Sequence, residues 1–383
     1  MTIPKIIYAT IHPSDTKKSW SGLNYYIANA LRLTGAEVIM VSGFRCRKSF
    51  WLKLRFHLAR LLGFNFYYDL TSTYGRQYAA QVDELLAADP DAVLFTVNSQ
   101  LIPYLQSANK VVIYNDATYA NLYGYYGFFS HLTPWDKKQC FRNERRAFQR
   151  ADLLFFASDW AAQSAISDFG ASSSKVNVIP FGANLANLPE KDEVHELIDI
   201  RRLAPIRLLW VGVDFGRKGG TIAVEVARLL NETGTPATLT IAGIPHLTEM
   251  GFPAFVKDGG VFDKDTPAGE EGLKDLYRHA DFFILPSLLE CYGVVFAEAS
   301  AFGLPLLAIR TGGVPTIVQH GFNGWLFEPA APAQQYADAI SNLVNQPMQY
   351  QIMARQARQV FDEKLNWQVA GEKIRSLISA LKT

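Results

Sequence analysis

Features that mark secreted, zinc-binding or membrane-spanning proteins are scarce in this chain of 383 residues. It has 3 cysteines, widely separated and without a C-x-x-C spacing. This pattern argues against a disulfide framework and structural zinc, and it favours a reducing compartment. No stretch reaches the ~18 consecutive apolar residues that a membrane span needs, and the N-terminal residues lack the charged start and long apolar core of a signal peptide. We therefore expect a cytoplasmic protein.

A marked excess of either charge is also missing. The 37 Lys and Arg residues nearly balance the 36 Asp and Glu residues, giving a formal net charge of +1. A dedicated nucleic-acid-binding protein would show a strong basic excess, so we expect no nucleic-acid partner. With 49% hydrophobic and 19% charged residues, the composition is typical of a folded chain. The length suits two domains of under ~200 residues each.

Short apolar runs alternate with helical segments along both halves, and this alternation predicts parallel sheets. A polar segment containing Pro189 separates the halves. We predict an α/β protein with two Rossmann-like domains: an N-terminal domain over 1–184, a linker over 185–204, a C-terminal domain over 205–366 and a closing helix over 367–383. Strands are expected at 5–10, 37–42, 92–97, 110–114, 153–157, 176–179, 206–211, 237–242, 282–285 and 306–308, and helices at 22–34, 221–233, 293–302 and 367–381.

The segment 285–324 carries the clearest chemical signal. Gly293 follows an apolar strand and opens a helix, whose first backbone amides, including those of Val294 and Val295, have no partner within the helix. These amides lie at the positive end of the helix dipole and form an anion site. Glu290 and Glu298, eight positions apart, offer carboxylates for paired hydroxyl groups. A diphosphate between two sets of hydroxyls describes a nucleotide sugar.

Glu290–Glu298 resembles the E-x7-E motif of retaining family-4 glycosyltransferases with the GT-B fold, the glycosyl transferases group 1. Three further matches follow in the family's order, at 303–305, 311–315 and 321–324. The resemblance implies two Rossmann-like domains that face a cleft, with the C-terminal helix crossing back to the first domain. It also implies a donor bound mainly by the second domain and an acceptor bound by the first.

The segment Val211–Gly219 resembles the family's diphosphate-neutralising loop. Lys218 matches, whereas the arginine that many members carry after the first glycine is replaced by Val213, so we expect the nearby Arg217 to substitute for it. The resemblance thus implies catalytic roles for Lys218, Arg217 and Glu290. The sequence has no metal-ligand cluster such as Asp-x-Asp in a suitable context, so we expect no metal ion, and no cofactor beyond the nucleotide diphosphate sugar as co-substrate. It also implies retention of the anomeric configuration.

Two further positions match the family's donor site. Gly22 opens the first helix and resembles the glycine loop that closes over the donor phosphates, although a glycine at a helix start is common. Lys264 ends a segment that resembles the one where family members contact the base through the main chain. The sequence does not identify the base.

The expected acceptor residues lie in the first domain. Asp116 follows the strand at 110–114, at an edge where parallel sheets build their sites. It is expected to accept the proton of the acceptor hydroxyl or to orient the acceptor sugar. The alternative is a helix-capping aspartate. Tyr119 belongs to an aromatic run suited to stacking on sugar rings, and His12 follows the first strand.

The stretch 45–62 is basic and amphipathic. It lies within 38–68, which contains no acidic residue, and large apolar side chains recur in it at near-helical spacing. Such a helix suits an anionic membrane surface, in which case the acceptor would be lipid-linked and the protein would lie at the inner face of the membrane. Ordinary packing on the domain surface explains the same pattern.

We therefore predict a retaining, metal-independent glycosyltransferase, of the hexosyltransferase type, that moves a sugar to a glycan or lipid-linked acceptor in polysaccharide or glycoconjugate synthesis. One alternative is a non-catalytic sugar-nucleotide-binding partner of a glycan-synthesis complex. Val213 and the missing histidine near Asn115 support that alternative. Another alternative is a nucleotide-sugar epimerase of similar fold.

Overall fold

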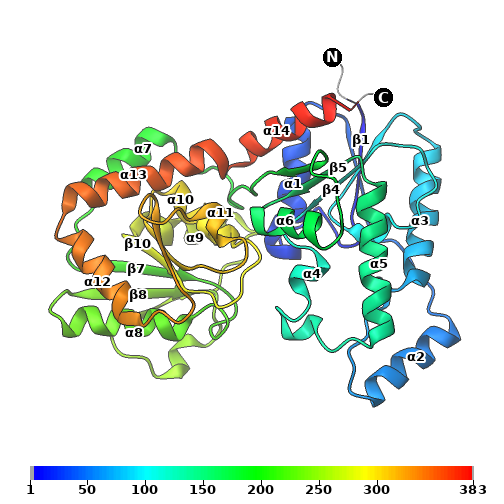
Figure 1. Ribbon diagram of the computed structural model, residues 1–383. Coiled ribbons are helices and arrows are strands. Elements are labelled where there is room, and N and C mark those ends of the chain that lie inside the picture. The colour runs from blue at the N-terminus through cyan, green and yellow to red at the C-terminus, as the bar shows by residue number, and fades with distance from the viewer. Residues whose placement is uncertain (1–3, 382–383) are drawn as a thin grey trace. The chain divides into compact units, whose positions relative to one another are not determined.

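Two six-stranded parallel sheets form the framework of the protein, as seen in a computed structural model that describes residues 4–381 (Figure 1). The chain divides into unit 1, residues 1–179 and 370–383, and unit 2, residues 180–369. Each unit contains one sheet with helices packed against it. The predicted α/β class with two Rossmann-like domains is confirmed.

The sheet of unit 1 has the order β2-β1-β3-β4-β5-β6. Its inner strands are almost entirely buried and apolar, as is usual for a parallel sheet covered on both faces. The strands are β1 (Ile6–Ala9), β2 (Val38–Val41), β3 (Val93–Thr96), β4 (Val111–Asn115), β5 (Leu153–Phe156) and β6 (Val176–Val178). The helices are α1 (Leu23–Leu33), α2 (Phe50–Leu61), α3 (Ser72–Ala87), α4 (Tyr119–Leu122), α5 (Pro134–Arg150) and α6 (Asp159–Ser167).

The sheet of unit 2 has the order β12-β11-β10-β7-β8-β9. The two outermost strands, β9 and β12, were not predicted, and β9 has a polar sequence with two glycines that gives no apolar run. The strands are β7 (Ile206–Val211), β8 (Ala237–Ala242), β9 (Val256–Gly260), β10 (Phe282–Leu285), β11 (Leu306–Ile309) and β12 (Gly324–Phe327). The helices are α7 (Lys191–Ile200), α8 (Gly220–Glu232), α9 (Pro267–His279), α10 (Val294–Ala301), α11 (Val314–Ile317), α12 (Ala333–Val344) and α13 (Pro347–Lys364).

The segment 185–204, expected as a linker, contains the helix α7, on which Val194 and Ile198 are buried. The last helix, α14 (Trp367–Ser379), begins in unit 2 and belongs to unit 1 from Ala370 onward. There it lies so close to α1 that a Cβ on Gly371 would come within 2.9 Å of the Ala30 carbonyl oxygen.

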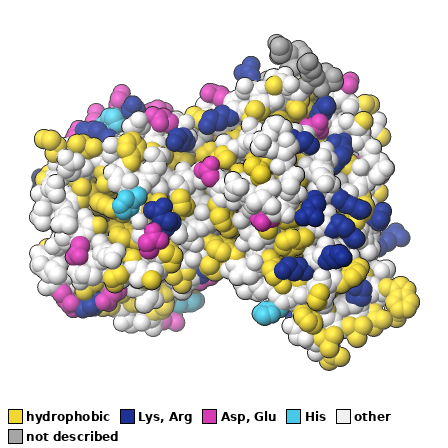
Figure 2. Space-filling model, in the orientation of Figure 1, with side chains coloured by type: hydrophobic (Ala, Val, Ile, Leu, Met, Phe, Trp, Pro, Cys, Tyr) yellow, Lys and Arg dark blue, Asp and Glu magenta, His cyan; other side chains and the backbone are white. Residues whose placement is uncertain are grey.

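The helix α2 falls inside the basic amphipathic stretch predicted at 45–62. One face packs on unit 1 through the buried Leu52 and Ala59. The opposite face leaves large apolar side chains in solvent, with Trp51 71% and Leu61 82% exposed. Figure 2 shows these hydrophobic side chains gathered where Figure 1 places α2. Within residues 4–381, no helix has both the length and the apolar character needed to cross a bilayer.

Candidate functional site

The centre of the sheet in unit 2 is a topological switch point. The strand β7 comes first in the sequence and pairs with β8 on one side and β10 on the other. The connections from β7 and β10 therefore leave toward different sides, and open parallel sheets bind ligands in the crevice between such loops. The predicted donor residues Lys218, Glu290 and Gly293 all lie in these two loops.

The two loops are in direct contact. Gly219 has a positive φ of 70° and would place a Cβ only 2.1 Å from the Pro286 carbonyl oxygen, so this position requires glycine. The Leu288 amide also donates to the Arg217 carbonyl at 2.9 Å. The loops after β7 and β10 therefore form one surface.

Lys218 and Glu290 form an ion pair across this surface. Their side chains are only 12% and 10% exposed. The Ser287 hydroxyl donates to the same carboxylate at 3.4 Å, and the Trp210 indole N–H donates to the Lys218 carbonyl at 3.1 Å, which fixes the loop. The structure thus brings together Lys218 and Glu290, two of the three residues whose catalytic roles the resemblance implies.

Glu298 lies on α10 and is fully buried. Lys264 donates to Oε1 at 2.8 Å and the Tyr277 hydroxyl donates to Oε2 at 2.9 Å. Burial, and secondarily the Glu298 charge, raises the pKa of Tyr277 well above its ordinary value, so the phenol stays protonated as a donor. Lys264, expected to act through its main chain, reaches the site with its side chain. Tyr277 was not predicted, because nothing in its local sequence distinguishes it from a core tyrosine.

The helix α10 begins at Val294, directly after Gly293. Gly293 has a φ of 88°, and a Cβ there would lie 2.7 Å from the Phe296 ring and 3.2 Å from Cγ of Glu290. The amides of Val294 and Val295 occupy the first turn, where helix amides have no intrahelical acceptor. An anion at this turn would lie beside the Glu290 segment.

Arg217 is held by its neighbours. Its Nε donates to Asp214 at 3.1 Å and its Nη1 donates to the Leu289 carbonyl at 3.0 Å. Hydrogen bonds from the Arg217 amide and side chain lower the pKa of Asp214. Val213, where the resemblance leads us to expect arginine, is 81% exposed. Arg217 therefore lies beside Lys218 in the chain with part of its donor capacity already used.

In unit 1, the predicted acceptor residues His12, Asp116 and Tyr119 line one cavity of about 440 Å³. The Thr118 side chain caps α4, so Asp116 is not the helix cap considered as its alternative role. The Tyr119 ring stacks on Phe129 with ring centres 5.3 Å apart, which covers one of its faces.

Gly22 is the N-terminal cap of α1 with a φ of 87° and does not line this cavity. Glu144 does line it and was not predicted. Its helix sequence is strongly charged, which is typical of a solvent-exposed face. Only the packing in the structure shows that Glu144 is part of the cavity wall.

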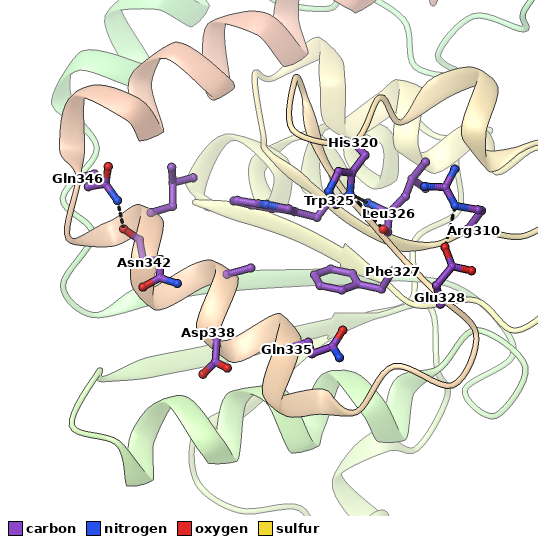
Figure 3. Close-up of a pocket in the computed structure, with 12 residues that line it drawn as sticks. Arg310, His320, Trp325, Leu326, Phe327, Glu328, Gln335, Asp338, Asn342 and Gln346 are labelled. Carbon is purple, nitrogen blue, oxygen red and sulfur yellow. Dashed lines mark hydrogen bonds and ion pairs between the residues drawn. The ribbon is translucent and has the colours of Figure 1, made fainter.

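A larger cavity of about 720 Å³ lies elsewhere in unit 2, between the outer strand β12 and the helix α12 (Figure 3). Arg310 and Glu328 pair across its rim at 3.0 Å, and His320 Nδ1 lies 3.1 Å from the Leu326 carbonyl oxygen. None of the predicted site residues lines it.

Residues 201–360 match the family model described as Glycosyl transferases group 1. The amylovoran biosynthesis glycosyltransferase AmsK of Erwinia amylovora is 28% identical over 248 residues, 62% of this chain and 58% of AmsK. A D-inositol 3-phosphate glycosyltransferase of Corynebacterium jeikeium is 28% identical over 268 residues, 65% of this chain and 61% of the relative. The chain thus spans between about half and about three fifths of the length of the curated relatives that it matches.

Among solved structures, Anabaena HepE in complex with UDP-glucose is similar, with a TM-score of 0.64 and 15% identity over 98% of this chain and all of HepE. At this identity the likeness shows the fold, which is the GT-B arrangement of two Rossmann-like domains. The matched segment 201–360 contains Lys218, Lys264, Glu290 and Glu298. Through this segment, which holds the donor residues predicted in unit 2, the chain is similar to the glycosyl transferases group 1, and its fold is that of the solved GT-B structures.

Proposed function

We propose that this protein is a glycosyltransferase that takes its sugar from a nucleotide diphosphate sugar bound at the switch point of unit 2. The observation that carries the proposal is the pair of lysine–glutamate contacts, Lys218–Glu290 and Lys264–Glu298, beside the first turn of α10. Lysines and helix amides suit a diphosphate, and carboxylates suit hydroxyl groups. The cationic groups and the carboxylates lie together at the carboxyl ends of the strands of one sheet.

Before the donor binds, the lysines and glutamates of the site are held in ion pairs with each other. Without a ligand, each mostly buried lysine is neutralised by a glutamate, which avoids the cost of an unpaired buried charge. When the donor binds, its phosphates replace Glu290 as the partner of Lys218, and Glu290 turns to the hydroxyls of the transferred sugar. Glu298 holds the ribose hydroxyls in the same way, with Tyr277 fixing its second oxygen.

In the transfer step, an acceptor hydroxyl oxygen bonds to the anomeric carbon while the bond from that carbon to the diphosphate breaks. The hydroxyl proton passes to the leaving diphosphate oxygen, so attack occurs on the departing face and configuration is retained. Lys218, Arg217 and the amides of α10 stabilise the charge that develops on the diphosphate. This arrangement supplies the positive charge from the protein and requires no metal ion.

The first donor to test is UDP-glucose, because HepE, whose fold is similar, was solved with it. The purified protein is screened by thermal shift against UDP-, GDP-, ADP- and dTDP-sugars, and nucleoside diphosphate release is then measured with and without acceptor sugars. Stabilisation by one donor together with acceptor-dependent release supports the proposal. Absence of release with every donor contradicts it.

The same assay separates the alternatives. A non-catalytic binding partner would be stabilised by a donor without releasing nucleoside diphosphate. An epimerase would convert the donor sugar with no acceptor present and also without release. Glycan assembly is the proposed setting, since AmsK is named for amylovoran biosynthesis.

We also propose that α2 docks unit 1 on an anionic membrane surface. The exposed stripe on α2 includes Trp51, Leu58 and Leu61, and exposed basic residues flank it, among them Lys53 and Arg60. An apolar stripe edged by lysine and arginine matches a headgroup–acyl boundary with anionic lipid. A membrane-bound enzyme of this kind would take a lipid-linked acceptor.

Vesicle co-sedimentation tests this docking. The protein should bind vesicles that contain phosphatidylglycerol and should not bind pure phosphatidylcholine, and added salt should weaken binding because it screens the basic residues. Trp51→Ser combined with Leu58→Ser should abolish binding. Met348→Ser, which changes a residue 74% exposed in unit 2, is the control. Equal binding by the double variant would contradict the proposal.

A further inference from the structure

The cavity in unit 1 lies at a second topological switch point. The strand β1 pairs with β2 and β3, and the cavity is lined from the loops that follow β1, β3 and β4 and from α5. By the same rule that places the donor in unit 2, this is where unit 1 is built to bind a ligand. If the protein is a glycosyltransferase as proposed above, the chemistry of this lining bears on which acceptors it takes.

Glu144 forms the inner wall of the cavity and is 2% exposed. The Tyr119 amide donates to Oε2 at 2.7 Å and the Ser99 hydroxyl donates to Oε1 at 3.4 Å. Within the described residues 4–381, no lysine or arginine pairs with Glu144. The carboxyl group therefore lies in a buried position with two neutral donors and no cation.

This environment keeps a proton on the carboxyl group at neutral pH. Burial raises the pKa of Glu144 to about 8, and the hydrogen bonds from Tyr119 and Ser99 offset only part of that effect. A protonated carboxyl both donates and accepts a hydrogen bond. Glu144 can thus bind a neutral hydroxyl group in either direction.

The rest of the lining has the same character. Of the described residues, those that line the cavity contribute amide, hydroxyl, imidazole, carboxyl and aromatic groups, but no lysine or arginine. Asn98, which helps to form the wall, is fixed by the Ile11 amide, which donates to its Oδ1 at 2.8 Å. Lys17, in the loop after β1, lies over the Tyr25 ring, 5.6 Å from its centre, and does not line the cavity.

A phosphate group is a poor match for this lining. It carries close to two negative charges and oxygens that only accept hydrogen bonds near neutral pH, so it is bound by arginine or lysine and is repelled beside aspartate or glutamate. A sugar ring instead presents neutral hydroxyls, which donate to Asp116 and exchange hydrogen bonds with Glu144 and the amides. Trp20, at the cavity edge, offers an aromatic surface for the ring.

We propose that the cavity in unit 1 binds an unphosphorylated sugar ring of the acceptor, with Glu144 hydrogen-bonded to one of its hydroxyl groups, and that it rejects the same ring bearing a phosphate. This differs from the D-inositol 3-phosphate glycosyltransferases among the relatives, whose names specify a phosphorylated acceptor.

Matched acceptor pairs test the proposal. Transfer from the donor identified by thermal shift is measured to methyl glucoside against glucose 6-phosphate, and to myo-inositol against inositol 3-phosphate. We expect the neutral member to be used at least about tenfold better in one pair or both. Equal use, a preference for the phosphorylated member, or no use of either neutral sugar would overturn it. Failure of the proposed function itself would show as no release of nucleoside diphosphate with any acceptor.

Two variants test the role of Glu144. Glu144→Gln keeps the shape and a donor group, so it should retain transfer near neutral pH. We expect the wild-type protein to lose acceptor affinity as pH rises through about 8, where Glu144 ionises, and Glu144→Gln should remove that loss. Glu144→Ala should raise the acceptor KM about tenfold and leave the donor KM unchanged, because the donor site lies in the other unit.

Glu84→Gln, at an exposed position on α3, is the matched control and should match the wild-type protein in both readouts. If Glu144→Gln kept the wild-type pH profile, or if Glu144→Ala raised the donor KM as much as the acceptor KM, Glu144 would have only a structural role.

Discussion

In unit 1, the loops at the switch point surround a cavity whose buried carboxyl group has no cation beside it, whereas in unit 2 the two glutamates of the candidate donor site, Glu290 and Glu298, are each matched to a lysine. Glu144 is bound by a backbone amide and a hydroxyl. Glu298, in contrast, is bound by Lys264 and Tyr277. In both sheets, the strand that comes first in the sequence has a neighbour on either side, so the loops at the switch point leave toward both sides.

The comparison shows that the fold fixes where a ligand binds, and the charges in the loops fix what binds there. A lysine matched to a glutamate can exchange its partner for a phosphate. An unpaired buried glutamate holds a proton and accepts only neutral or cationic groups. The same architecture therefore suits an anionic donor in one unit and a neutral acceptor in the other.

Of the variants that test this comparison, Lys218→Ala should show the largest effect. Lys218→Ala is expected to slow transfer by about a hundredfold or more, because leaving-group charge loses its closest cation. It should also lower the thermal midpoint, because Glu290 is left mostly buried without a partner. Steady-state kinetics and thermal unfolding of the purified variant measure both effects.

Two further variants separate the rate effect from the stability effect. Lys218→Ala combined with Glu290→Gln should recover the midpoint without recovering the rate. Lys257→Ala, which removes an exposed lysine from β9, should match the wild-type protein in both. A wild-type rate in Lys218→Ala would mean that the contrast in charge between the units has no catalytic role.

A smaller effect is expected from Glu298→Gln. The substitution keeps the side-chain shape but removes the charge that faces Lys264, and it should raise the donor KM by about tenfold if this carboxylate binds ribose. Acceptor KM should be unaffected. Glu249→Gln, at a side chain 75% exposed in the same unit, is the control, and an unchanged donor KM in Glu298→Gln would remove the ribose role.

The contact between the two loops of unit 2 can be tested with a pair of glycines. Gly219 and Gly234 both have positive φ, 70° and 81°, so alanine costs about 1 kcal/mol of backbone strain at each. At Gly219 the added Cβ also meets the Pro286 carbonyl oxygen, whereas at Gly234 nothing lies within 4 Å. Gly219→Ala should therefore lower the free energy of unfolding, measured in urea, by roughly 1–3 kcal/mol more than Gly234→Ala does. If both variants lost the same free energy of unfolding, the loops after β7 and β10 would be able to move apart without cost.

A further test of the comparison uses pH. Glu144 has a folded-state pKa of about 8 against an ordinary value of 4.5, so between these values the unfolded chain releases a proton that the folded protein keeps. Stability from this group is then highest at low pH and falls as pH rises, by up to about 1.4 kcal/mol per pH unit. Urea unfolding across this range should show a shallower pH dependence for Glu144→Gln than for Glu84→Gln. Identical slopes would place a cation near Glu144.

Much of this architecture could be predicted from the sequence. The alternation of apolar runs with helices gave the inner strands of both sheets, and Gly293 marked the start of α10 to within one residue. Glu290, Glu298 and Lys218 were identifiable because they lie in a dense local motif. These features depend on neighbours in the chain, which is the information that a single sequence carries.

What could not be predicted depends on residues far apart in the sequence. Glu144 lies among Arg142, Arg145 and Arg146, a pattern typical of a solvated helix face, and only the packing of α5 turns it inward. The partnership of Lys264 and Tyr277 with Glu298 joins three separate elements. The outer strand β9 carries lysine, aspartate and two glycines, so no apolar run signals it.

The backbone contact at Gly219 and Pro286 has a consequence for engineering donor specificity. Since the loops after β7 and β10 touch with no side chain between them and share the Leu288–Arg217 hydrogen bond, neither can change its path without the other. A loop grafted alone from a relative would meet a partner shaped for a different backbone. Transplanting both loops together, as one cassette, is the route by which a new nucleotide sugar would be accommodated.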